Sequence, residues 1–274
     1  MDQKQKILNR LAEMELSPKR SLGQNFLVSE SVIHRILAQV RSYQPQNIIE
    51  IGPGLGSLTE GLQKLGCPLK LIELDREFAG YWKRRSAHQQ GAEMSSLEIV
   101  EGDALQFEEK EWVWGEKTLL VSNLPYQIGA RVVIDRSCGP LNIQRMVLMF
   151  QKEVAQRLAA EPSTKDYGFL TVVAQAEWKI HPVTDAGSHD FYPPPRVTSR
   201  VLAFERKNHV VDDFFVSVVK KAFSQRRKFM LKSFAAEKEM VLTVLQALGY
   251  DEKVRAEEIQ VEHYIELVKK LRKS

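Results

Sequence analysis

The chain has 274 residues, of which 43% are hydrophobic and 27% are charged. This balance excludes a fibrous or intrinsically disordered protein, because the first would be repetitive and the second poorer in apolar residues. The length allows one large domain and a smaller one. A formal net charge of +4 is compatible with a nucleic-acid partner but does not require one.

The cysteines and the first residues bear on the cellular compartment. Cys67 and Cys138 stand in unrelated contexts without a CxxC pattern, so the sequence supports neither a disulfide framework nor a metal site. Residues 1–16 mix charges with apolar residues at helical spacing, whereas a signal peptide has an uninterrupted apolar centre. We expect a cytoplasmic protein with reduced thiols and no membrane span.

The first predicted elements are helices, at residues 3–14 and 33–40, on either side of a polar, basic stretch at 17–29. Strand-like apolar runs follow at 47–52, 69–75, 97–103, 118–123 and 145–150, with amphipathic segments between most of them. This alternation predicts an α/β fold in which helices cover both faces of a parallel sheet.

The last third of the chain changes character. Residues 169–183 and 200–207 predict two further strands, separated by the rigid turn FYPPP at 191–195. Beyond Arg206 the apolar spacing is wholly helical. We therefore predict two domains, a large one of residues 1–206 and a small all-helical one of residues 207–274.

Three features at predicted strand ends point to a cofactor. Gly52 and Gly54 open a GxGxG turn that lets a ligand approach the backbone, but it lacks the GxGxxG spacing of dinucleotide sites. Glu73, about twenty residues on, stands where a carboxylate accepts from ribose hydroxyls, and Asp103 where one could accept from an adenine amino group. Each acid alone is more often a cap or turn former. Together they favour an adenosine-containing cofactor, and S-adenosylmethionine fits.

The run NLPY at 123–126 follows the fourth strand. Pro125 pushes Leu124 into an extended conformation, so that the Asn123 amide and the Leu124 carbonyl offer two neighbouring acceptors. Two acceptors could hold both hydrogens of an exocyclic amine and orient its nitrogen for attack, while Tyr126 offers a ring for a base to stack on. The alternative is an ordinary strand exit.

Several motifs in this order resemble the ribosomal RNA small subunit adenine N6,N6-dimethyltransferase A family. They are LGQNFL at 22–27, EIGPGLGSLT at 50–59, IELD at 72–75, GDAL at 102–105, NLPY at 123–126, QKEVAQRL at 151–158, FYPPPRVTS at 191–199 and AFSQRRK at 222–228. The resemblance runs from about Ser17 to Leu267.

The resemblance implies a Rossmann-like class I methyltransferase sheet and a metal-free dimethylation of two adjacent adenines in the 3′-terminal hairpin loop of small-subunit rRNA, within a 30S precursor particle. Catalytic roles fall on Asn123, Leu124, Tyr126 and Phe191, the last closing the other face of the adenine. Cofactor contacts fall on Asn25, Leu27, Gly52, Gly54, Glu73, Asp103 and Asn123. The basic run at 220–232, with Arg226, Arg227 and Lys228, is the candidate RNA surface, although such a run is usually a solvated helix face. We expect a monomer.

The chain departs from the family in two places. Gly129 stands where a hydroxyl residue usually follows NLPY, and residues 231–234 replace a usual Arg and Asn-Leu pair. Two other functions share many of these features: a large-subunit rRNA methyltransferase of the erythromycin-resistance type and a non-catalytic RNA-binding assembly factor. The AFSQRRK motif favours the small subunit, and intact Glu73, Asp103 and NLPY favour catalysis.

Overall fold

A computed structural model describes residues 1–88, 96–207, 209–225 and 228–273. The chain divides into two compact units. The first comprises residues 1–132, 140–155 and 181–205, and the second comprises residues 133–139, 156–180 and 206–274. The second unit therefore collects three separate stretches of sequence.

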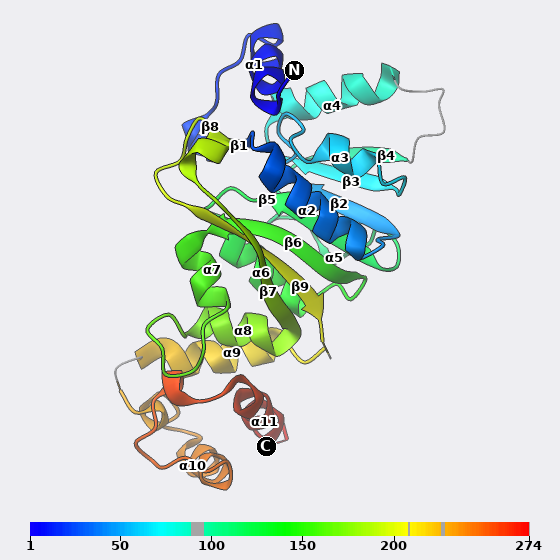
Figure 1. Cartoon of the computed structure of the whole chain (residues 1–274). Helices are drawn as coiled ribbons and strands as arrows, with labels where there is room; N and C mark the ends of the chain where they lie inside the picture. The colour runs from blue at the N-terminus through cyan, green and yellow to red at the C-terminus, as the bar shows by residue number, and fades with distance from the viewer. Residues whose placement is uncertain (89–95, 208, 226–227, 274) are drawn as a thin grey trace. The chain divides into compact units, whose positions relative to one another are not determined.

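The central element is a seven-stranded sheet in the order β4-β3-β2-β5-β6-β9-β7 (Figure 1). Its strands are β2 (Asn47–Ile51), β3 (Leu69–Glu73), β4 (Leu97–Glu101), β5 (Thr118–Asn123), β6 (Ile143–Gln151), β7 (Trp178–Ala186) and β9 (Ser199–Arg206). Strands β4, β3, β2, β5 and β6 are mutually parallel, and β9 joins β6 antiparallel. The carboxyl ends of the parallel strands consequently share one edge.

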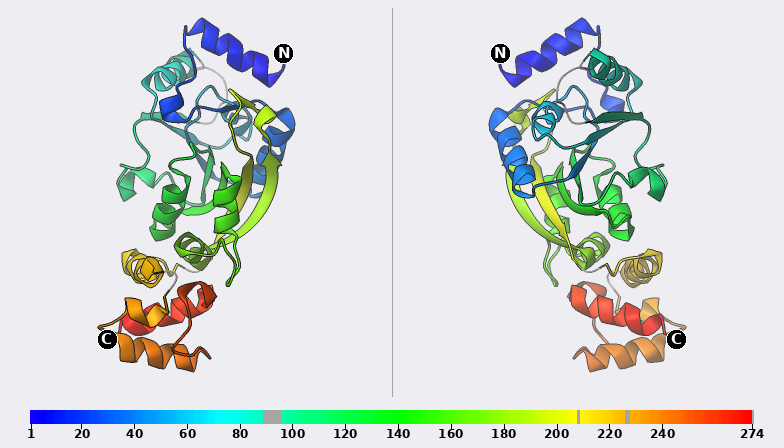
Figure 2. Two further views of the ribbon diagram at one scale, coloured as in Figure 1. Left: turned by 90° about the vertical axis from the view of Figure 1, so that its left-hand side faces the viewer. Right: turned by 90° about the vertical axis from the view of Figure 1, so that its right-hand side faces the viewer.

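Helices alternate with the parallel strands along the chain. They are α1 (Gln3–Glu13), α2 (Glu30–Ser42), α3 (Thr59–Gln63), α4 (Arg76–His88), α5 (Glu109–Trp112), α6 (Gly129–Cys138) and α7 (Lys152–Leu158). Helix α2 lies on one face of the sheet and α5 on the other (Figures 1 and 2). The predicted Rossmann-like sheet with helices on both faces is confirmed.

The core on the α2 face follows the two-residue period of the strands. Alternate residues such as Leu69 and Leu71 in β3 point to the same face and meet Ile36 and Val40 of α2 in one buried cluster. Burying each such side chain contributes roughly 1.5–3 kcal/mol. This packing favours one strand register, because a one-residue slip of β3 would exchange its two faces and bring Lys70 into this cluster in place of a leucine.

Residues 169–177 form a helix, α8 (Phe169–Glu177), so the prediction of a strand there was wrong. The strand begins only at Trp178. An apolar run buried all round has no diagnostic period, and β-branched residues favoured the strand interpretation. The hydroxyl of Thr171 accepts from the Gly168 backbone N–H at 3.0 Å and so caps the first turn of α8.

The second unit is helical beyond Arg206, as predicted. After α9 (Asp213–Ala222) come α10 (Lys238–Ala247) and α11 (Val261–Leu271), which pack with α8 around a separate apolar cluster that includes Phe215, Leu245 and Tyr264. Asp212 caps α9 by accepting from the Phe215 N–H at 2.9 Å. Arg226 and Arg227 lie outside the described residues, whereas Lys228 is exposed.

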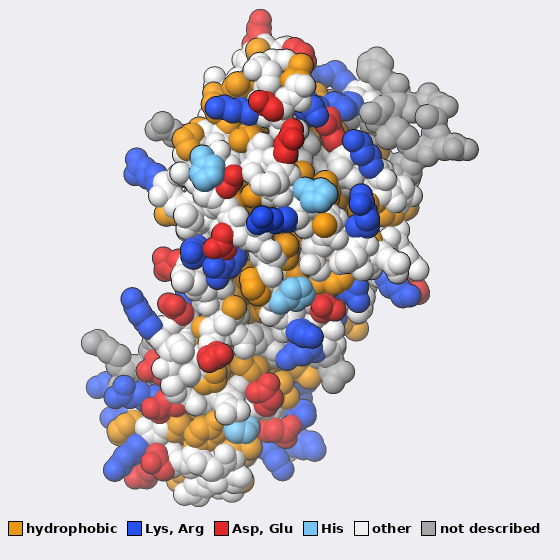
Figure 3. All heavy atoms as spheres, in the orientation of Figure 1, with side chains coloured by type: hydrophobic (Ala, Val, Ile, Leu, Met, Phe, Trp, Pro, Cys, Tyr) orange, Lys and Arg blue, Asp and Glu red, His pale blue; other side chains and the backbone are white. Residues whose placement is uncertain are grey.

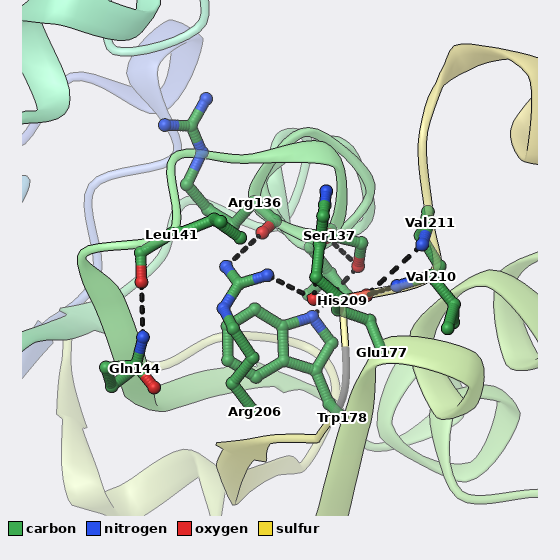
Figure 4. A network of polar contacts seen from close by, with 11 residues as sticks. Arg136, Ser137, Leu141, Gln144, Glu177, Trp178, Arg206, His209, Val210 and Val211 are labelled. Atoms are coloured by element: carbon green, nitrogen blue, oxygen red, sulfur yellow. Dashed lines mark hydrogen bonds and ion pairs between the residues drawn. The ribbon is translucent and has the colours of Figure 1, made fainter.

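The second unit contains a buried ion pair between Glu177, the last residue of α8, and Arg206, the last residue of β9 (Figure 4). Glu177 is fully buried and binds the Arg206 guanidinium, and its other oxygen accepts from the Val210 and Val211 N–H groups. Arg206 lies over the Trp178 ring at 4.2 Å. Each lone pair of the buried carboxylate thus faces a donor, which is what its burial requires.

Candidate cofactor and substrate site

A cavity of the first unit, of about 180 Å³, lies at the carboxyl ends of β2, β3 and β5. Its lining includes Asn25, Gly52, Gly54, Glu73, Asp103, Asn123, Leu124 and Tyr126. These predicted residues come from separate stretches of sequence, and the shared edge of the parallel strands brings them together.

The glycine loop after β2 has a backbone that only glycine adopts readily. Gly52 has φ +62° and Gly54 has φ +51°. A Cβ on Gly54 would also lie 3.1 Å from the Phe26 ring, so a side chain there would crowd the cavity wall. Phe26, a cavity residue missed in the sequence, is the apolar neighbour that this loop packs against.

Glu73 is buried and forms part of the cavity lining. Its two oxygens accept from the backbone N–H groups of Gly54, at 3.0 Å, and Asp75, at 2.8 Å. Burial raises the pKa of Glu73 to about 7, although those hydrogen bonds oppose the shift. The carboxylate therefore links the glycine loop to the end of β3 and still has lone pairs for a ligand hydroxyl.

Glu50 is a cavity residue that the sequence did not single out as functional. It is 2% exposed, lines the cavity, and carries an Oε2 atom without a hydrogen-bond partner among the described residues. Burial raises the pKa of Glu50 to about 8, and the nearby Glu73 adds to the shift. The available signal was a lone acid inside the apolar strand NIIEI. A buried carboxylate beside a cavity suits a cationic ligand.

Asp103 lies in the loop after β4 and is held from both sides. Its Oδ1 accepts from the Leu105 N–H at 2.9 Å, and its Oδ2 accepts from the Gln106 side chain at 3.2 Å. Leu74 lines the same cavity as Asp103, and its side chain is 56% exposed. An oriented acid and an exposed apolar side chain together suit the edge and the face of a purine ring.

Asn123 ends β5, and its amide nitrogen donates to the Asn25 carbonyl at 3.1 Å. This bond fixes the amide, so the Asn123 Oδ1 is left as the acceptor. Asn25 in turn donates to the Gly23 carbonyl at 3.1 Å, which ties the 21–25 loop to the strand end. The acceptor role that the sequence suggested for Asn123 stays a prediction.

Leu124 and Tyr126 continue the cavity wall from Asn123. The Tyr126 hydroxyl lies 3.0 Å from the Ser199 hydroxyl, and burial raises the pKa of the phenol, so the ring stays neutral and held at its tip. Its face remains available to a planar group.

Two predicted site residues lie elsewhere. Leu27 and Phe191 are 0% and 4% exposed and belong to the buried core cluster, and neither is among the described cavity-lining residues. They are neighbours in a small antiparallel pair, β1 (Phe26–Leu27) with β8 (Phe191–Tyr192). The motif at 191–195 is thereby joined to the LGQNFL motif, and the cavity residue Phe26 is paired with Tyr192 in the same two strands.

The departure at Gly129 has a steric explanation. Gly129 begins α6, and a Cβ there would lie 2.9 Å from the Phe150 ring of β6. A hydroxyl residue would have to displace this ring. The helix therefore begins with a close backbone approach in place of the expected hydroxyl.

Among the described residues, no group of three or more His, Cys, Asp or Glu is placed to hold a metal ion. No helix in the described ranges is long and apolar enough to cross a membrane.

Solved structures with the same fold include a dimethyladenosine transferase from Plasmodium falciparum (TM-score 0.74, 24% identity, covering 89% of this chain and 96% of that one). Another is the 23S rRNA methyltransferase ErmE (TM-score 0.66, 22% identity, covering 90% and 100%). The fold is that of Rossmann-like methyltransferases.

The sequence comparisons are more specific. A family model described as ribosomal RNA adenine dimethylase matches residues 16–273. A relative from Bdellovibrio bacteriovorus, named ribosomal RNA small subunit methyltransferase A, is 44% identical over 265 residues, or 93% of each chain. One of the same name from Desulfitobacterium hafniense is 37% identical over 254 residues, or 89% of each. The chain belongs to the ribosomal RNA adenine dimethylase family.

Proposed function

We propose that this protein transfers methyl groups from S-adenosylmethionine to the N6 atoms of two adjacent adenines in the 3′-terminal hairpin loop of small-subunit rRNA. The observation that carries the proposal is that Asn123, Leu124 and Tyr126 line the same cavity as Glu73 and Asp103. One cavity thus offers contacts for an adenosine cofactor and for a second, reacting amine.

S-adenosylmethionine supplies an electrophilic methyl group on a sulfonium. Glu73 would accept from the ribose hydroxyls, Asp103 from the adenine amino group, and Leu74 would cover a ring face. The unpartnered carboxylate oxygen of Glu50 suits a cationic group of the cofactor, which carries both an ammonium and a sulfonium.

The Asn123 Oδ1 and the Leu124 carbonyl would hold the two hydrogens of the target amine. Held in this way, the nitrogen lone pair points at the methyl group instead of delocalising into the ring. Tyr126 would stack on the base, worth roughly 1–3 kcal/mol by analogy with single-strand binders. Because paired bases are stacked, the target adenine must be looped or flipped out to reach this cavity.

Phe191 as the second lid of the adenine, and Leu27 as a cofactor contact, would require these core side chains to act through their backbone or after a local movement. We keep both as proposals, with Asn25 and the glycine loop as the nearer cofactor contacts. Gly52 and Gly54 would bring the backbone close to the cofactor.

The basic run with Arg226, Arg227 and Lys228 is the proposed RNA-binding surface, and residues 1–206 and 207–274 are the proposed catalytic and RNA-binding domains. A 30S precursor particle is the proposed substrate. A cytoplasmic location goes with this substrate and with the two free cysteines. We propose a monomer.

The test is methyl transfer from labelled S-adenosylmethionine to unmethylated 30S particles, with 50S particles as control and nucleoside analysis of the product. Dimethyladenosine confined to the small subunit is the expected result. Label in the 50S particle would move the protein to the erythromycin-resistance type. Cofactor binding without any transfer would favour a non-catalytic assembly factor.

A further inference from the structure

A second hollow, separate from the cofactor cavity, lies in the first unit between α1 and α4. We call it the α1–α4 groove, and its lining includes Lys6, Arg10, Glu13, Tyr81, Arg84 and Arg85. Its volume is about 550 Å³, and it is more open to solvent than the cofactor cavity. In Figure 3 Lys and Arg side chains lie among Asp and Glu side chains at the top of the view, where Figure 1 places α1 and α4.

Two of its arginines are already fixed. Glu60 binds the guanidinium groups of both Arg10 and Arg85, and Arg85 also donates to the Tyr81 hydroxyl at 2.8 Å. A guanidinium has five N–H donors in a rigid fork, so each keeps donors to spare. Arg10 and Arg85 thus form a floor whose cationic groups need no ordering when an anion arrives.

Two further cations, Lys6 and Arg84, line the same groove, and Lys6 is close enough to Glu60 to help lower the pKa of that carboxyl. Within the part of the chain that the structure describes, the Lys6 ammonium and the Arg84 guanidinium form no hydrogen bond or ion pair, and Arg84 is exposed. Four cationic side chains face two carboxylates, Glu13 and Glu60, which leaves two positive charges uncompensated. Unpaired cations that converge on one groove repel one another unless an anion joins them.

We propose that the α1–α4 groove binds backbone phosphates of the RNA substrate, outside the cofactor cavity. The two fixed guanidinium groups add positive charge to the groove, although Arg10 also donates to the Leu55 carbonyl and is only 12% exposed, whereas Lys and Arg side chains without a partner track a polyanion. The groove is open and large, which suits a strand with several phosphates better than one small anion. This inference rests on the proposed RNA substrate and adds a second contact surface to it.

The test is the salt dependence of binding of the full-length chain to unmethylated 30S particles between 50 and 200 mM salt, as about 1 unit of log-log slope reports each lost phosphate contact. The variant is Lys6→Glu with Arg84→Glu, which spares the residues that hold Glu60. The matched control is Lys4→Glu with Lys64→Glu. It makes the same charge change at exposed positions of the same unit that do not line the groove. Cofactor binding by calorimetry checks that each variant is folded.

We expect the groove variant to bind the particle at least tenfold more weakly than the control, with a slope shallower by about 1 to 2 units and unchanged cofactor affinity. A groove variant with the control's affinity and slope would overturn the inference alone. A second result would also overturn the inference. If the wild type and the groove variant had equal salt slopes, and inorganic phosphate raised the melting temperature of the wild type alone, the groove would hold a small anion and not RNA. A wild-type chain that binds cofactor but no particle would overturn the proposed function and this inference with it.

Discussion

At the scale of single residues, Asn123 and Glu73 occupy different parts of one cavity and should fail differently. Asn123→Ala removes the amide that faces the amine, so we expect transfer to fall about 10²–10³-fold and cofactor affinity to change less than about tenfold. Glu73→Ala removes a buried acceptor worth about 1.5–3 kcal/mol, so it should weaken cofactor binding about 10- to 150-fold. Single-turnover transfer and calorimetry measure the two effects.

A further variant separates these roles from misfolding. Ser199→Ala removes only the partner of the Tyr126 hydroxyl, so both properties should stay within a fewfold of the wild type. If Asn123→Ala and Glu73→Ala lost transfer and cofactor binding to the same degree, with a lower melting temperature in both, the assigned roles would be wrong.

Glu50 and Glu73 make cofactor binding pH-dependent. Burial raises their pKa values to about 8 and 7, so in the free protein both keep protons that the unfolded chain loses near 4.5. These acids therefore add stability at low pH, and we expect the free energy of unfolding of the cofactor-free protein to fall as pH rises from about 5 to 8. A urea titration at several pH values measures this.

A cationic ligand favours the ionised carboxylates, so cofactor binding near pH 7 should release protons. Calorimetry in two buffers of different ionisation enthalpy measures the release. Glu50→Gln is measured at the same pH. The difference in proton release between the wild type and this variant then excludes protons that come from the cofactor itself, because that contribution is the same in both. Equal proton release by Glu50→Gln and wild type would show that Glu50 is not the group that ionises.

The sequence predicted which residues meet at one cavity best where a side chain at a strand end faces the shared edge; their roles stay predictions. Glu73, Asp103 and Asn123 all line the cavity because the parallel strand order brings their strand ends together, whereas Asn25 reaches it from a loop that a hydrogen bond ties to Asn123. Glu50 was not predicted as a site residue because it lies inside a strand. There the two-residue period predicts only the face of the sheet to which the side chain points. Phe191 was tied to the site by motif, yet its burial depends on pairing with Leu27, a residue far away in the sequence.

At the scale of elements, the end of α8 depends on the ion pair between Glu177 and Arg206. Their side chains are 0% and 3% exposed, so removal of one partner leaves a buried charge without compensation. We expect Arg206→Met to lower the free energy of unfolding by about 3–5 kcal/mol, and Arg206→Met combined with Glu177→Leu to cost less. Urea midpoints at constant m-value measure both.

The exposed pair of Lys221 and Glu237, at 2.8 Å in the same unit, is the control. Its side chains are 41% and 37% exposed, so Lys221→Gln should cost at most about 1 kcal/mol. A similar cost for Arg206→Met would mean that water reaches Glu177 and that the pair does not fasten this end of α8.

The same region shows why one element was misread. Residues 169–177 contain Val172, Val173 and other apolar residues without a polar face, so neither the strand period nor the helix period stands out. Only tertiary surroundings, a fully buried helix among α9 and α11, select the helical form. Strands β2 to β6 were read correctly because each is short, apolar and bounded by turn residues.

At the scale of the whole molecule, the division at Arg206 stays a prediction. The helical character of the C-terminal residues is legible in the sequence, but the second compact unit also takes in residues 133–139 and 156–180. A boundary drawn from a change in periodicity follows the order of the chain, whereas a compact unit gathers segments that are close in space. The contacts that recruit those earlier segments have no local sequence signature.

The distribution of charge over the molecule, more than its net value of +4, should govern affinity for RNA. The run at 220–232 holds six basic residues and no acid, and Lys220 and Lys228 are exposed. We expect Lys220→Glu with Lys228→Glu to weaken 30S binding and to make its log-log salt slope shallower by about 1 to 2 units. Each phosphate contact that is lost reduces the number of counterions released on binding. Filter binding from 50 to 200 mM salt measures the slope.

Lys238→Glu with Lys253→Glu, the same charge change at exposed positions of the same unit outside that run, should leave the slope nearly unchanged. The contrast matters because any reversal lowers the net charge and weakens long-range attraction, whereas only a lost contact changes the number of counterions released. If both variants shifted affinity equally with parallel slopes, the run would act only through the overall field of the protein, and the contact surface for RNA would have to lie elsewhere.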